Sequence, residues 1–205
     1  MVCGSIFSHG YYFTHSTITK GNEVRIGIDI SQLAYENTGV AKYLGQLVEQ
    51  LIKLDRNDEF ILFYSSLRRN FQFSTLPSGD NFQSNPNVQI KQFKYPPTFL
   101  DLLWNKLHIC PIEWFIGPVD VFITSDWTEP PAIKARKMTI IYDMIVYKYP
   151  EETDKKIVAT QKRKLHWAKK EDSAFLCISE STKKDAEQIL HIAKEKLFVI
   201  YPGIN

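Results

Sequence analysis

Residues 25–52, RIGIDISQLAYENTGVAKYLGQLVEQLI, decide the fold of this chain. They begin with a short apolar run at 25–30, pass through a polar loop at 31–39 and end in a segment with helical spacing of apolar residues. The apolar positions of that segment are Val40, Tyr43, Leu44, Leu47, Val48, Leu51 and Ile52. Thr38 suits the N-cap position of this helix. The stretch therefore predicts a strand, a loop and an amphipathic helix.

The same alternation continues along the chain. Further strands are predicted at 59–64, 88–93, 119–124, 138–142, 174–178 and 197–200, and helices at 98–116 (interrupted by Pro111), 151–170 and 181–190. The strands are rich in Val, Ile and Phe and alternate little with polar residues, which is typical of a sheet that is buried on both faces. We therefore predict an α/β domain with a doubly wound, mostly parallel, Rossmann-like sheet.

Composition excludes several classes of protein. With 205 residues and 44% apolar residues, the chain can bury a core. Its 25 basic and 23 acidic residues lack the basic excess of a dedicated nucleic-acid binder, so no nucleic-acid partner is expected. Cys3, Cys110 and Cys177 include no C-x-x-C pair, and the five histidines lack metal-ligand spacing, so no metal is expected. The cysteine usage favours a reducing cytoplasm, and no apolar run approaches the roughly 20 residues of a spanning helix.

The chain divides into three parts. Residues 1–24 lack the pattern of a secretory signal, so we take them as a mobile arm, an added segment or a wrongly assigned start. Residues 25–200 form the predicted domain. Residues 201–205 begin a linker, because Pro202-Gly203 is a turn signal directly after the last strand.

Ligands of doubly wound sheets bind beyond the carboxyl ends of the strands, so the loops at 31–39, 124–131 and 143–150 and the turn after 178 are candidate sites. In the first loop, Asn37, Thr38 and Gly39 lead into a helix N-terminus, where backbone N–H groups can hold a phosphate or another anion. An ordinary capped helix start is the alternative. The G-x-G-x-x-G fingerprint of dinucleotide-binding proteins is absent.

Two further loops carry polar and aromatic side chains. Asp126, Trp127 and Glu129 combine carboxylates with an aromatic ring, which suits a sugar, since carboxylates accept from hydroxyls and a ring covers C–H surface. A solvated turn with one packed Trp is the alternative. Tyr142 and Asp143 end a buried strand, where Asp143 can orient a ligand or merely cap the next turn.

The predicted helix at 151–170 begins with acidic residues and ends with basic ones. That order suits the helix dipole and predicts a solvated helix face. Peripheral contact with an anionic membrane surface is the alternative.

Three blocks of the chain together resemble a known family. IGIDISQLAYENTGVAKYLGQLVEQL, VDVFITSDWTEPPAIKARKMTIIYDMIVYKYPEE and DSAFLCISESTKKDAEQILHIAKEKLFVIYPGIN are similar, in this order, to the amino-terminal domain of retaining group-1 glycosyltransferases with the GT-B fold. The similarity covers about residues 25–205. Its strongest part is the turn at 179–182 together with the run at 200–204.

The resemblance implies a division of labour between two domains. The nucleotide-sugar would be a co-substrate, with no other cofactor, and would bind mainly to a second domain beyond Asn205. This domain would hold the glycan or lipid-linked acceptor. The implied roles are donor phosphate binding at Thr38 and Gly39, acceptor contact at Asn37, Asp126, Trp127 and Glu129, and a catalytic place near the reacting sugar for Tyr142 and Asp143.

Tyr142 departs from the family pattern, which has His at this position. A Tyr can form hydrogen bonds but does not become a cation near neutral pH. A different contact in this branch and a weak or inactive relative are both open.

The resemblance leads to two expectations for these 205 residues. They should be inactive alone, and the face meant for a second domain should form an open cleft that offers a surface for self-association. The alternatives are a stand-alone sugar- or nucleotide-binding module, an inactive remnant, and another GT-B relative such as a nucleotide-sugar epimerase.

Overall fold

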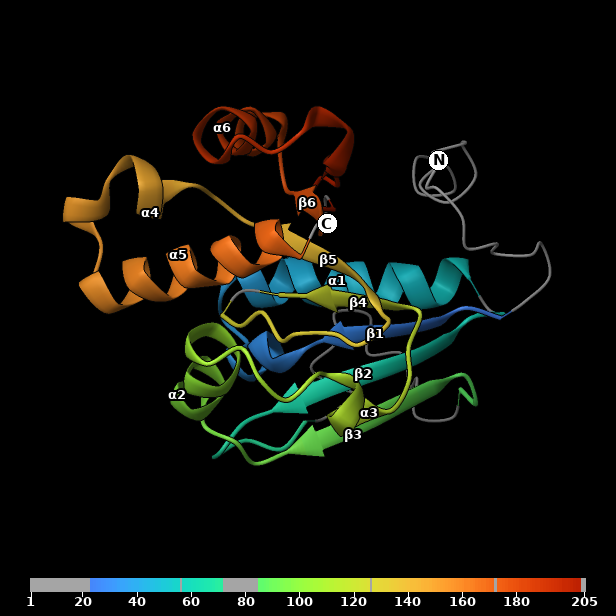
Figure 1. Cartoon of the computed structure of the whole chain (residues 1–205). Helices are drawn as coiled ribbons and strands as arrows, with labels where there is room; N and C mark the ends of the chain where they lie inside the picture. Colours follow the sequence, from blue (N-terminus) through green and yellow to red (C-terminus); the bar gives the residue numbers. More distant parts are fainter. Residues whose placement is uncertain (1–22, 56, 72–84, 126, 172, 204–205) are drawn as a thin grey trace.

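A parallel sheet of seven strands forms the centre of the structure (Figure 1). The strand order is β3-β2-β1-β4-β5-β6-β7, and every neighbouring pair in it is parallel. The strands are β1 (Arg25–Asp29), β2 (Glu59–Ser65), β3 (Val88–Phe93), β4 (Val121–Thr124), β5 (Arg136–Ile141), β6 (Ala174–Cys177) and β7 (Leu197–Val199). The predicted α/β sheet is therefore confirmed.

The computed structural model describes residues 23–55, 57–71, 85–125, 127–171 and 173–203. Most of the segment 1–24, for which the sequence predicts a mobile arm, lies outside the described residues. Asp126, one of the predicted acceptor contacts, also lies outside them, as do the last two residues of the predicted linker.

Helices and helical turns connect the strands. They are η2 (Ser31–Ala34), α1 (Gly39–Leu54), α2 (Pro97–Leu100), η5 (Asp101–Lys106), α3 (Glu113–Ile116), α4 (Ile145–Lys148), η6 (Pro150–Glu152), α5 (Lys155–Lys170), α6 (Glu180–Leu190) and η7 (Lys194–Lys196). The segment η5 has π-helical hydrogen bonding, whereas η2, η6 and η7 are 3-10 turns.

The sheet is buried on both faces, as β2 illustrates. Phe60, Leu62 and Tyr64 point to one face, where they pack with the apolar stripe of α1. Ile61 and Phe63 point to the other face, where they pack with the segment from α2 to α3. Successive side chains of a strand point to opposite faces, so a strand that is covered twice must be apolar throughout.

A further apolar cluster surrounds the far end of the sheet. Leu165 and Ala168 of α5 and Ala186 and Leu190 of α6 pack there with Phe175 of β6. In Figure 1, α5 (orange) crosses near β5, and α6 (red) lies beside β6. The two helices thereby cover the strands that follow β4.

Caps at the helix starts agree with the sequence pattern. The Thr38 hydroxyl accepts a hydrogen bond from the Ala41 backbone N–H at 3.2 Å, as an N-cap of α1 does. Asp154 accepts from the N–H groups of Lys156 and Ile157 at 2.8 and 3.3 Å, so α5 begins at Lys155. The predicted helix at 151–170 is therefore wrong in its first residues, which form the separate turn η6.

The predicted helix at 98–116 is also wrong as a single element, because it consists of three short segments. Its break includes Pro111, which has no backbone N–H, and two left-handed residues, His108 (φ 52°) and Cys110 (φ 61°). The Trp104 indole donates to the Cys110 carbonyl at 3.0 Å, which ties the break to the core.

Strands β1 and β4 lie side by side although they are far apart in the chain. From β1 the chain moves outward through β2 to β3, then returns to β4 and moves outward the other way. In doubly wound sheets, such a reversal leaves a crevice at the carboxyl ends of the two central strands. The strand order thus places a cleft between the loops that follow β1 and β4.

We predict that Gly27→Ala destabilises the domain. A Cβ atom on Gly27 would lie 2.7 Å from Cδ2 of Phe122 and 2.9 Å from Cδ1 of Ile116. Such overpacking should lower the free energy of unfolding by about 1–3 kcal/mol, as measured by chemical denaturation. Gly39→Ala is the control, because no atom lies within 4 Å of its Cβ position. Equal stability of the two variants would contradict the close packing of β1.

Candidate functional site

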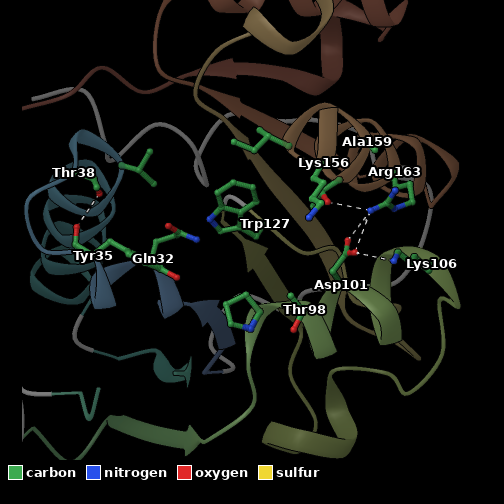
Figure 2. Close-up of a pocket in the computed structure, with 14 residues that line it drawn as sticks. Gln32, Tyr35, Thr38, Thr98, Asp101, Lys106, Trp127, Lys156, Ala159 and Arg163 are labelled. Carbon is green, nitrogen blue, oxygen red and sulfur yellow. Dashed lines mark hydrogen bonds and ion pairs between the residues drawn. The ribbon is translucent and has the colours of Figure 1, made fainter. Parts of the chain in front are cut away.

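A cavity of about 700 Å³ lies at the carboxyl ends of the central strands, where the strand order predicts a crevice. We call it the main cavity. Figure 2 shows that residues of the β1 loop and the start of α1 face residues of η5 and α5 across Trp127. Its lining residues are Gln32, Tyr35, Thr38, Val40, Pro97, Thr98, Asp101, Lys106, Trp127, Lys156, Ile157, Ala159, Thr160 and Arg163.

Trp127 occupies the junction of three cavities. Besides the main cavity, it lines a cavity of about 220 Å³ that contains Tyr142 and Asp143, which we call the Tyr142 cavity. It also lines a cavity of about 400 Å³ that contains Asp29, which we call the Asp29 cavity. Its side chain is half-buried, so an indole surface remains available to a ligand. Trp127 is therefore the predicted site residue that lines all three of these cavities.

The buried side chain of Asn105 holds the Trp127 segment in place. Its amide nitrogen donates to the Trp127 carbonyl at 2.8 Å and to Asp101 Oδ1 at 3.0 Å. Its amide oxygen accepts from the Glu129 backbone N–H at 3.0 Å. A buried amide that makes all these bonds permits little movement, so the backbone at Trp127 and Glu129 is held in place.

One side of α5 forms a wall of the main cavity. Lys156, Thr160 and Arg163 are spaced by four and three residues, which places them on one helix face. Nη2 of Arg163 lies 3.1 Å from both carboxylate oxygens of Asp101 and 3.0 Å from the Thr160 hydroxyl. Sequence reasoning missed these residues, because it assigned the charged face of the helix to solvent, although the spacing itself was visible.

Most basic side chains of α5 are exposed, as the solvated-face interpretation predicts, but Lys164 is an exception. The side chain of Lys164 is buried, with 1% of the residue exposed. Its ammonium group donates to the carbonyls of Ser125, directly after β4, and Ile140, the last residue but one of β5. A buried ammonium group requires such acceptors, so this contact fixes α5 against the strand ends.

The loop before α1 contributes one of its three predicted residues to the main cavity. Thr38 lines it, and the Thr38 hydroxyl also donates to the Tyr35 carbonyl at 2.9 Å. Asn37 and Gly39 are exposed and are not among the lining residues. The backbone at Gly39 faces open space, so no close packing explains the glycine.

Tyr142 and Asp143 line the Tyr142 cavity next to Trp127. The Tyr142 hydroxyl lies 3.2 Å from Oγ of Ser125, and its ring meets the Tyr43 ring edge-on at 5.7 Å. Asp143 is exposed, and its Oδ1 accepts from the Ile145 backbone N–H at 2.9 Å. Asp143 therefore caps a turn while it borders the cavity.

Glu129 does not line any of these three cavities, which corrects the expectation that it contacts an acceptor. It is completely buried, with 0% of the residue exposed. Its carboxylate accepts from the hydroxyls of Thr124 and Thr139 at 2.8 and 3.1 Å and lies 2.7 Å from Nζ of Lys137. Sequence alone cannot reveal this role, because the partners come from two strands.

The ion pair continues from Lys137 to the end of α5. The Lys137 ammonium group also contacts the Glu171 carboxylate, and Glu171 lies 2.9 Å from Nε2 of His108. The other ring nitrogen of His108 lies 2.8 Å from the Trp104 carbonyl, and its ring stacks on Trp167 at 3.7 Å. This network joins the η5 region, the start of β5 and the C-terminal end of α5.

The Asp29 cavity adds a buried carboxyl at the carboxyl end of β1. Burial raises the pKa of Asp29, while hydrogen bonds from Ser31 and the charge of Lys164 oppose this shift. Asp29 Oδ1 accepts a hydrogen bond from the Ser31 backbone N–H at 2.9 Å. Sequence analysis missed Asp29 because it lies within the apolar run of β1.

Searches for two other kinds of site give negative results for the described part of the chain. It contains no group of three or more His, Cys, Asp or Glu side chains arranged to hold a metal ion. No helix within the described ranges has the length and apolarity to cross a bilayer.

Comparison with known proteins gives no match: no family model, no curated protein and no solved structure is similar to the chain.

We predict that the Glu171 network stabilises the fold in a pH-dependent way. Burial alone raises the pKa of Glu171, but the hydrogen bond from His108 and the charge of Lys137 lower it overall. A carboxylate whose pKa is lower in the native state than in the unfolded state stabilises the fold. This stabilisation is fully present above the unfolded-state pKa and is lost as the pH falls through the native-state pKa. At pH 7, Glu171→Gln should therefore cost about 1–3 kcal/mol, with the difference shrinking below about pH 4.

Thermal unfolding of both proteins between neutral and acidic pH measures this difference. Glu187→Gln on the exposed side of α6 is the control and should follow the wild type at each pH. A Glu171→Gln penalty that stays constant down to pH 3 would contradict an ionic role for this carboxylate.

Proposed function

We propose that this domain binds the acceptor in a glycosyltransferase that moves a sugar from a nucleotide-sugar to a glycan or lipid-linked glycan, with retention. The observation that carries the proposal is the position of Trp127, half-buried at the junction of three cavities at the strand carboxyl ends. Doubly wound sheets bind ligands at this edge. An aromatic face surrounded by hydrogen-bonding groups suits a sugar ring.

The polar groups around Trp127 support a sugar as the ligand. Gln32, Thr38 and Thr98 line the main cavity and bring amide and hydroxyl groups, which can both donate and accept hydrogen bonds. Val40 and Pro97 add apolar surface to the same walls. Sugar hydroxyls and C–H faces require this mixture of partners.

The cavities on the two sides of Trp127 suggest how the reaction would be arranged. The acceptor would occupy the main cavity, and the reacting sugar would lie near Tyr142 and Asp143 in the Tyr142 cavity. The resemblance assigns the nucleotide-sugar mainly to a second domain, which would close over this face and exclude water. The chain has no glycine-rich dinucleotide fingerprint of its own, which agrees with that assignment.

A sugar-binding module without chemistry is the second candidate. The observation that favours it is that the carboxylates of Glu129 and Asp143 both make structural contacts. A binding module needs the Trp127 cavities but no reactive carboxylate.

We predict that Trp127→Ala weakens acceptor binding. Loss of the aromatic contact should raise the acceptor KM about 2- to 13-fold, which corresponds to about 0.5–1.5 kcal/mol. Transfer is measured as release of nucleoside diphosphate by the full-length protein, with a panel of nucleotide-sugars and oligosaccharides. Trp114→Ala is the control, because Trp114 is 70% exposed and lines none of the three cavities.

Two results would contradict the proposal. Sugar binding that depends on Trp127 without transfer from any donor would favour the binding module. Failure of every sugar to bind would remove both candidates.

We also predict a smaller effect for Tyr142→Phe, which removes only a hydroxyl. If that hydroxyl forms a hydrogen bond to the reacting sugar, turnover should fall about 2- to 13-fold with the thermal midpoint nearly unchanged. Ser125→Ala is the matched control, because it removes the hydroxyl that lies beside that of Tyr142. Unchanged turnover in Tyr142→Phe would assign Tyr142 to packing alone.

A further inference from the structure

The main cavity concentrates positive charge. It is lined by Lys106, Lys156 and Arg163 but by only one carboxylate, that of Asp101. The chain as a whole is almost balanced, with 25 basic and 23 acidic residues. The excess of positive charge is therefore local to the cavity. A cleft with low-dielectric walls strengthens the attraction of this charge for an anion.

The three basic side chains differ in their ion-pair partners. Arg163 forms an ion pair with both oxygens of Asp101 and so helps to shape the wall. Lys106 lies 3.8 Å from the same carboxylate. Lys156 forms no ion pair with a carboxylate of the described residues and is exposed at the cavity. Its ammonium group is thus the one that a ligand can engage at least cost.

Nearby carboxylates do not neutralise Lys156. Asp154 precedes it by two residues, but its Oδ1 accepts from the backbone N–H groups at the start of α5. Asp101 already has Arg163 and Lys106 as partners. Apolar side chains of Val40, Ile157 and Trp127 lie along the same cavity. Because apolar walls lower the local dielectric, a charge contact there is stronger than on an open surface.

The neighbouring Tyr142 cavity, which shares Trp127 with the main cavity, has a different charge. It contains Asp143 and no basic side chain among its lining residues. A ligand that spans both cavities would therefore place its negative charge near Lys156 and its neutral hydroxyl groups near Asp143. The charges of the two cavities would thus favour one orientation of the ligand as well as a negative charge on it.

We propose that the main cavity recognises an acidic sugar, whose ring lies against Trp127 and whose carboxylate or phosphate group is bound by Lys156. The choice of a sugar rests on the proposed function, whereas the acidic group rests on the charges of the cavity. Lys106 supplies long-range attraction, and Arg163 forms the ion pair with Asp101 that offsets the charge of this carboxylate at the cavity.

Binding of four probes to this chain tests the proposal: glucose, glucuronate, glucose 1-phosphate and inorganic phosphate. The readout is the NMR shift of the Trp127 indole N–H group, which is assigned with Trp127→Phe. At low salt, glucuronate, glucose 1-phosphate or both should bind about tenfold more tightly than glucose, since one charge contact corresponds to about 1.4 kcal/mol. The difference should shrink as salt is added.

Variants of α5 isolate the contribution of Lys156. Lys156→Gln should weaken binding of the acidic probes about tenfold and leave glucose unaffected. Lys155→Gln is the matched control, because it removes the same charge from an exposed neighbour that does not line the cavity. Lys156→Arg should retain binding of the acidic probes, and a native amide spectrum of each variant shows that it has folded.

The outcomes separate the inference from the proposed function. Tight binding of glucuronate alone identifies a carboxylate, and tight binding of glucose 1-phosphate alone identifies a phosphate. If glucose binds as tightly as both acidic probes, the inference of an acidic ligand is overturned, but the proposal of a sugar site is not. Inorganic phosphate that binds as tightly as glucose 1-phosphate, or equal losses in Lys155→Gln and Lys156→Gln, overturns the inference. A Trp127 signal that responds to no sugar overturns both proposals.

Discussion

The reversal of chain direction between β1 and β4 is the constraint on which the rest of the structure depends. Two neighbouring parallel strands whose connections diverge leave a gap at their carboxyl ends that no helix fills. Apolar contacts cover both faces of the sheet, but they cannot close this edge. The main cavity and the two smaller ones meet at Trp127 because the loop after β4 begins at the edge of this gap.

Buried polar contacts define the rims of the gap. Lys164 binds carbonyl groups at the ends of two strands, and Asn105 joins η5 to the Trp127 segment. A buried ammonium or amide group is costly unless its partners are in place, so these contacts tolerate few alternative arrangements. Their effect is to hold an aromatic surface and the charged wall of α5 in fixed positions before any ligand arrives.

Charge has a different meaning at the level of the chain and at the level of the cavity. A nearly neutral composition lacks the basic excess that is typical of dedicated nucleic-acid binders, but it says nothing about where the charges lie. In the folded domain, Lys137 and Lys164 are buried in structural contacts, whereas Lys156 remains at the cavity. Residues with the same formal charge therefore serve as anchors or as candidate ligand contacts according to their burial.

Local patterns in the sequence determined the strands and helix α1, although they did not reveal the breaks within 98–116 and before α5. The apolar periodicity of α1, its Thr38 cap and the continuous apolar run of β2 depend on neighbours within a few residues, so the sequence alone predicts them. Tertiary structure decided which polar residues meet. Glu129 became a buried partner of Lys137, and Lys156 of α5 came to line the same cavity as Trp127, because folding joined distant segments. No local pattern records such contacts, since their energies depend on burial and distance in the folded chain.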